Sequence, residues 1–140
     1  MSTYYVFYAE KYNLTNKQWE CICPYFPSLD AEGYEITPLI VGQSYLAELY
    51  QFMTEYSRSR ADFSEAIAKK LEDRDDAYAT VYAEGLRLLA EGKDEDYQDK
   101  ETISVAKEIL NTVSVLENLY RENHWRDDYL PCVRIVAYFE

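Results

Sequence analysis

Two apolar runs near opposite ends of the chain constrain its fold more than any other feature. The first, residues 3–9, consists of β-branched and aromatic residues and is hydrophobic on both alternating faces, which predicts a central strand. The second, residues 132–139, is again predicted to be a strand. A strand so close to a chain end is usually paired into a sheet, and we expect the opening run to be its partner.

Two further strands are predicted in the first third of the chain. Residues 19–25 place their aromatic and cysteine side chains on one face, and residues 34–41 follow after a turn-rich segment. Pro24 and Pro38 restrict these strands to sheet edges or bulges, because proline donates no backbone hydrogen bond.

After Gly42 the hydrophobic spacing becomes helical. It predicts helices over residues 44–58 and 102–121, and between them a region, 62–92, that is either one long helix or two helices with a break near 73–76. Gly92 is a natural residue to follow a helix end.

This order of elements predicts an α+β fold: a small antiparallel or mixed sheet of about four strands, the N-terminal three plus the C-terminal one, with about three helices packed on one face. The chain has 140 residues, 48% of them hydrophobic, with only 4 glycines and 4 prolines and no linker-like stretch. We therefore expect a single domain over residues 1–140.

The net charge of −12 is concentrated in the middle of the chain, where residues 61–101 carry 13 acidic and 6 basic side chains. Such a charge disfavours direct binding to nucleic acid or to an anionic membrane, and it attracts a basic protein partner. The first residues lack the character of a signal peptide and no run is long enough to span a bilayer, so we expect a cytoplasmic protein with no membrane association. The alternative that the acidity only maintains solubility stays open.

Metal binding is not expected. Cys21, Cys23, His124 and Cys132 are the only conceivable zinc set, but the two alternating cysteines have poor spacing for that metal.

The acidic segment 91–101 resembles a calcium loop in composition only. A calcium loop begun at Asp94 would have Asp99 where glycine is required and Val105 where the bidentate glutamate belongs. The better interpretation is an interhelical loop in which Asp99 or Thr102 caps the last helix.

Catalysis is not expected either. The single histidine lies at a helix exit among carboxylates, and no nucleophile is placed by a recognisable motif. The sequence predicts no catalytic residue, no cofactor and no enzymatic activity.

The candidate site is an anionic ridge. Carboxylates four residues apart on a helix lie about 6 Å apart along its axis, similar to successive phosphates, and Glu72 and Asp76 have this relation. Basic residues interrupt the same region. The predicted partner-binding residues are Glu72, Asp73, Asp75, Asp76, Glu84, Glu91, Asp94, Glu95, Asp96, Tyr97 and Asp99.

The chain's 15 tyrosines divide by context into two predicted groups. Those on apolar stripes are expected in the core: Tyr5, Tyr50, Tyr78 and Tyr120. Those beside charged or turn segments are expected at the surface, where tyrosine is common in interfaces: Tyr12, Tyr34, Tyr56, Tyr97 and Tyr129.

Together these features favour a small acidic inhibitor that occludes a basic partner such as a nucleic-acid-processing enzyme. Phage counter-defence proteins of the anti-CRISPR or DNA-mimic kind are the nearest analogy, and the analogy is one of physical type only. Two alternatives stay open: a toxin-neutralising immunity protein, and a small-ligand binder or enzyme with a cleft near Arg134, His124 or Tyr138. Homodimerisation is compatible with all three.

Overall fold

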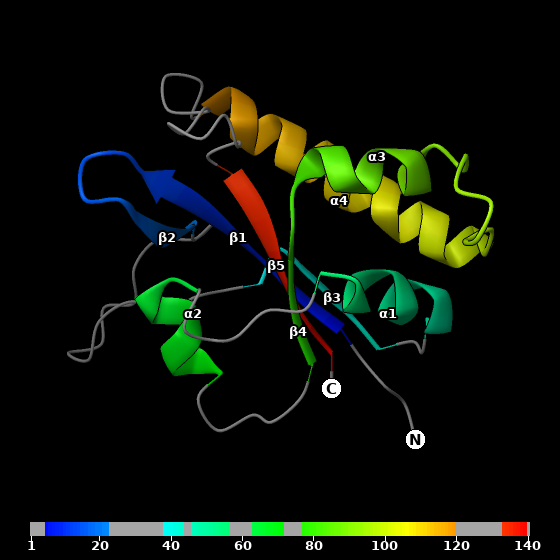
Figure 1. Ribbon diagram of the computed structural model, residues 1–140, viewed down its shortest axis with the longest axis horizontal. Coiled ribbons are helices and arrows are strands. Elements are labelled where there is room, and N and C mark those ends of the chain that lie inside the picture. Colours follow the sequence, from blue (N-terminus) through cyan, green and yellow to red (C-terminus); the bar gives the residue numbers. More distant parts are fainter. Residues whose placement is uncertain are drawn as a thin grey trace.

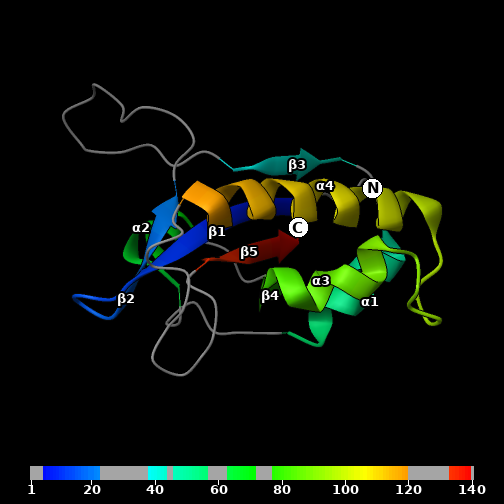
Figure 2. The same ribbon diagram turned by 90° about the horizontal axis from the view of Figure 1, so that it is seen from above.

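An antiparallel sheet forms the centre of the computed structural model, which describes residues 5–22, 38–43, 46–56, 63–71, 77–119 and 133–139 (Figure 1). The strands are β1 (Tyr5–Asn13), β2 (Gln18–Ile22), β3 (Ile40–Gly42), β4 (Ala77–Val81) and β5 (Val133–Phe139). The sheet order is β2-β1-β5-β4, and the short β3 also pairs with the first residues of β1 (Figure 2).

The first and last strands pair with each other, as the two apolar runs predict. In their antiparallel register Tyr5 lies opposite Phe139 and Lys11 lies opposite Val133. Every residue of β5 is buried, because β5 lies between β1 and β4 and is covered on both faces.

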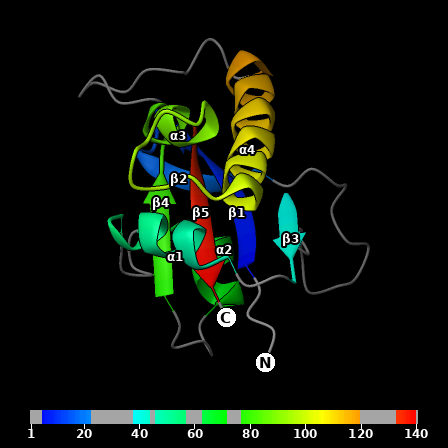
Figure 3. The ribbon, with the colours of Figure 1, turned by 90° about the vertical axis from the view of Figure 1, so that its right-hand side faces the viewer.

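The structure describes four helices: α1 (Ala47–Thr54), α2 (Glu65–Lys70), α3 (Ala83–Ala90) and α4 (Lys100–Leu119). Helices α1, α3 and α4 pack on one face of the sheet, and α2 packs on the other (Figures 1 and 3). The α+β class is confirmed. The expectation that all helices pack on one face is wrong, because α2 packs on the other. Strands β1 and β5 carry apolar side chains on both faces, so the second face also needs a cover.

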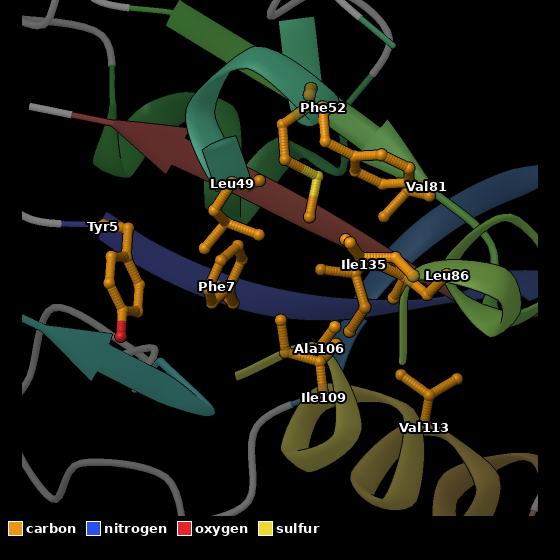
Figure 4. Close-up of a cluster of buried hydrophobic side chains, with 14 of the residues drawn as sticks. Tyr5, Phe7, Leu49, Phe52, Val81, Leu86, Ala106, Ile109, Val113 and Ile135 are labelled. Atoms are coloured by element: carbon orange, nitrogen blue, oxygen red, sulfur yellow. The ribbon is translucent and has the colours of Figure 1, made fainter. Parts of the chain in front are cut away.

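The larger core lies between the sheet and the three helices (Figure 4). Phe7 from β1, Ile135 from β5, Leu49 from α1, Leu86 from α3 and Ile109 from α4 are all completely buried there. Burying one such side chain contributes about 1.5–3 kcal/mol, so this layer supplies much of the driving force for folding.

A smaller core lies on the opposite face, under α2. Phe63, Ile67 and Leu71 on and beside this helix cover the even-numbered side chains of β1 and β5. Tyr138 from β5 stacks on Tyr78 from β4, with ring centroids 5.7 Å apart.

Tyr50 on α1 departs from its predicted place in the core. It is 39% exposed, although its ring meets Phe139 edge to face at 5.3 Å. The helical spacing put Tyr50 on the same stripe as Leu49, but the stripe that α1 buries is narrower than that spacing suggests.

Residues 77–81 form strand β4, and the prediction of a helix through this segment is wrong. Tyr78 and Val81 have a spacing that fits a helix, yet Tyr78 faces the α2 core and Val81 faces the larger core, as alternation in a strand requires. The segment pairs with β5 from Ala77 opposite Phe139 to Val81 opposite Ile135. This long-range pairing stabilises a strand here, although the local spacing favours a helix.

The boundaries of the other elements also differ from those predicted. Helix α1 spans residues 47–54 of the predicted 44–58, and α4 spans 100–119, close to the predicted 102–121. The predicted strands 19–25 and 34–41 are described only in part, as 18–22 and 40–42, and residues 23–37 lie outside the described chain. None of the described helices is long and apolar enough to cross a membrane.

Candidate functional site

The segment between α3 and α4, residues 91–99, has a defined backbone conformation. Gly92 ends α3 with a positive φ of 70°, and the backbone N–H of Lys93 donates to the carbonyl of Leu88 at 3.0 Å. At the other end, a carboxylate oxygen of Asp99 accepts the N–H of Thr102 at 3.0 Å and its hydroxyl at 2.9 Å. The predicted role of Gly92 is therefore confirmed, and of the two residues predicted to cap α4 the structure has Asp99 rather than Thr102. Both ends of the loop are fixed.

Tyr97 anchors the middle of this loop. Its ring meets Phe52 of α1 edge to face at 5.5 Å, and its hydroxyl donates to Glu55 at 3.2 Å. The residue is 6% exposed, so the prediction of a surface tyrosine is wrong. Its charged neighbours in the sequence pointed to the surface, but the ring turns inward to pack beside Phe52.

Helix α1 brings two further carboxylates to the loop. Glu48 accepts the backbone N–H of Asp99 at 3.2 Å, and Glu55 accepts the hydroxyl of Tyr97. The contact lies at the right-hand end of the molecule in Figures 1 and 2, where α1 and the α3–α4 loop come together. We call this region the acidic end: residues Glu48, Glu55, Glu91, Asp94, Glu95, Asp96, Asp99 and Glu101.

Burial and two of these carboxylates raise the pKa of the same two tyrosines, Tyr97 and Tyr56. Burial, and then the negative charges of Glu55, Asp94 and Asp96, raise the pKa of Tyr97. Burial, followed by Glu55 and Asp94, likewise raises the pKa of Tyr56. Along the segments 47–56 and 91–101 the only basic side chains are Lys93 and Lys100.

The structure brings together some of the predicted site residues. Asp94, Glu95, Asp96 and Asp99 lie in the loop, and Glu91 begins it with an ion pair to Lys93 at 3.1 Å.

Glu84 lies about two turns before Glu91, near the start of α3, where it pairs with Arg87 at 3.2 Å. The remaining four predicted residues, Glu72, Asp73, Asp75 and Asp76, lie outside the described residues.

Glu48 and Glu55 were not predicted. They belong to an apolar helical segment, and the loop residues that they contact lie 51 and 42 positions further along the chain, so only tertiary packing brings them together. The described residues include no group of three or more histidine, cysteine, aspartate or glutamate side chains arranged to hold a metal ion.

A second charged group is buried under α2, on the opposite face of the sheet. Arg134 Nε donates to Glu10 Oε1 at 2.7 Å, and the two side chains are 7% and 0% exposed. The other oxygen of Glu10 accepts the backbone N–H of Ser64 at the start of α2. The guanidinium carbon of Arg134 also lies 3.9 Å from the centroid of the Trp19 ring.

The Glu10–Arg134 pair occupies part of the place where a cleft was predicted around Arg134, His124 and Tyr138. Arg134 bonds to Glu10 and Tyr138 stacks on Tyr78, so both are engaged in internal packing. His124 lies outside the described residues.

The fold and its charge distribution define an α+β domain with an acidic end built from α1, the α3–α4 loop and the start of α4. No protein-family model, curated protein or solved structure matches the chain.

Proposed function

We propose that this protein is an inhibitor or regulator that binds a basic protein partner through its acidic end and occludes the surface with which that partner binds nucleic acid. The observation that carries the proposal is the convergence of carboxylates from α1 and from the α3–α4 loop around Tyr97.

Preorganisation supports a binding role for this region. A flexible acidic tail loses conformational entropy when it binds, whereas this loop is already held by Gly92, Tyr97 and Asp99. A loop backbone held in this way presents its carboxylates to a partner in a defined arrangement, which favours fast association and specific register.

The charge balance sets the kind of partner. The acidic end carries eight carboxylates against Lys93 and Lys100 in the same segments. A groove lined by lysine and arginine, as in an enzyme that processes nucleic acid, has the complementary potential. A counter-defence protein of the anti-CRISPR or DNA-mimic type is the physical class that this arrangement suits best.

The test is a pull-down from lysate of the native host with two variants of equal charge. Glu95→Lys with Asp96→Lys reverses two exposed carboxylates of the acidic end. The matched control, Glu65→Lys with Glu108→Lys, reverses two exposed carboxylates elsewhere, on α2 and on α4 about 12 Å along the helix from its start.

We expect a basic partner that is retained by the unaltered protein and by the control, released as salt rises, and lost with the acidic-end variant. A partner retained equally by both variants, or lost equally with both, would contradict the proposal, because net charge rather than this surface would then govern binding.

A further inference from the structure

Helix α2 is short and depends on the sheet for its helical state. Its six residues are too few to form a stable helix alone, since isolated helices shorter than about 12 residues are marginal in water.

Hydrogen bonds connect the described residues at both ends of α2 to the sheet. At the start, Glu10 accepts the backbone N–H of Ser64, and at the end the hydroxyl of Tyr78 donates to the carbonyl of Leu71 at 3.3 Å. Between them Ile67 is completely buried against the smaller core.

One feature of this packed state is unfavourable. Ser64 is 3% exposed, and among the described residues its hydroxyl oxygen has no hydrogen-bond partner. Serine usually stabilises a helix start by accepting a backbone N–H two or three residues on, but the Ser64 side chain makes no such bond. A buried hydroxyl without a partner destabilises the state that buries it, and contact with water removes this penalty.

We propose that α2 is a cover poised to open from the second face of the sheet without unfolding of the rest of the domain. Opening hydrates the Ser64 hydroxyl and exposes the Glu10–Arg134 pair together with Tyr8 and Tyr138, which are otherwise buried. The larger core on the opposite face keeps the sheet intact, so the opening is a local equilibrium.

Native-state hydrogen exchange tests the proposal. The reporters are the amides of Ala68 and Leu71, which donate to Ser64 and Ile67 at 2.9 and 3.0 Å. We expect them to exchange at least about tenfold faster than the amides of β5, which require global unfolding. Equal rates at the two places would overturn the proposal.

Ser64→Ala tests whether the unpartnered hydroxyl favours or opposes the opening of α2. Removing the unpartnered hydroxyl should slow exchange at Ala68 and Leu71 by about fivefold, which corresponds to about 1 kcal/mol at 1.4 kcal/mol per tenfold change. Faster exchange would show that the hydroxyl stabilises the helix start, and it would overturn the proposal.

Asp99→Ala is the matched control, because Asp99 caps α4 with its side chain. Loss of this cap destabilises the native state and the α2-open state equally, since α4 is folded in both. We therefore expect faster exchange in β5 and unchanged exchange at Ala68 and Leu71. If these two amides accelerate together with β5, α2 opens only by global unfolding and the proposal fails.

Discussion

Replacing Arg134 by methionine should destabilise the domain far more than the same replacement at Arg87. Both arginines donate from Nε to a glutamate, at 2.7 Å for Arg134 and 3.2 Å for Arg87. The Glu10–Arg134 side chains are 0% and 7% exposed, whereas those of Glu84 and Arg87 are 81% and 51% exposed. The two substitutions thus make the same chemical change in opposite solvent environments.

The magnitudes follow from this difference in exposure. Arg134→Met leaves the Glu10 carboxylate buried without its counter-charge, which typically costs about 3–5 kcal/mol. Arg87→Met removes a hydrated pair that is worth about 0–1 kcal/mol. Adding Glu10→Gln to Arg134→Met should restore at least about 1 kcal/mol, because the amide has no charge to bury and its oxygen still accepts the N–H of Ser64.

Urea unfolding followed by far-ultraviolet circular dichroism measures all three variants. This signal avoids the fluorescence of Trp19, which changes when Arg134 is removed from its ring. The reasoning is refuted if Arg134→Met costs no more than Arg87→Met, or if the double variant is less stable than Arg134→Met alone.

Three further predictions concern backbone space, titration and capping. Gly42→Ala should cost about 1–3 kcal/mol in urea unfolding, because an added Cβ would overlap the Tyr5 ring; no loss of stability would show that the ring has room to move. Tyr97→Phe should reduce the loss of stability above about pH 10, because there the unfolded phenol ionises while the raised pKa of Tyr97 keeps the folded one protonated. The free energies of unfolding at about pH 8 and about pH 10.5 should therefore differ less for this variant than for the unaltered protein. An unchanged pH dependence would exclude Tyr97 as a contributor. Asp99→Ala should lower stability by about 0.5–2 kcal/mol through loss of the α4 cap, whereas Thr102→Val, which keeps the capped N–H, should cost less; the reverse order would contradict the capping geometry.

The sequence predicted the elements whose local signals agree with their tertiary setting. The apolar runs 3–9 and 132–139 predicted β1 and β5, whose residues 5–9 and 133–139 are buried. Strand β1 continues to Asn13, four residues beyond the apolar run that predicted it. Helix α4 has a continuous apolar stripe, and Asp99 precedes it as a capping residue, so its start was predicted to within two residues.

The errors fall where distant residues decide the outcome. Local spacing predicts a helix through residues 77–81, because it contains no sign of the pairing between β4 and β5. Tyr97 was placed at the surface because its neighbours are charged, although Phe52 provides a contact for its ring. The Glu10–Arg134 pair joins residues 124 positions apart, and Glu10 carries no sequence signal that marks it as buried.

The central place of β5 has a consequence for how the domain is made. Its neighbours β1 and β4 are synthesised first, and the strand that joins them in the sheet comes last of the described strands. At roughly 5–20 residues per second, the 120 residues from Asn13 to Val133 take about 6–24 s to synthesise. Throughout that time the edge of β1 that pairs with β5 has no partner strand, so the nascent chain is vulnerable to aggregation until β5 is synthesised. Completion of the sheet must then wait for the synthesis of its middle strand.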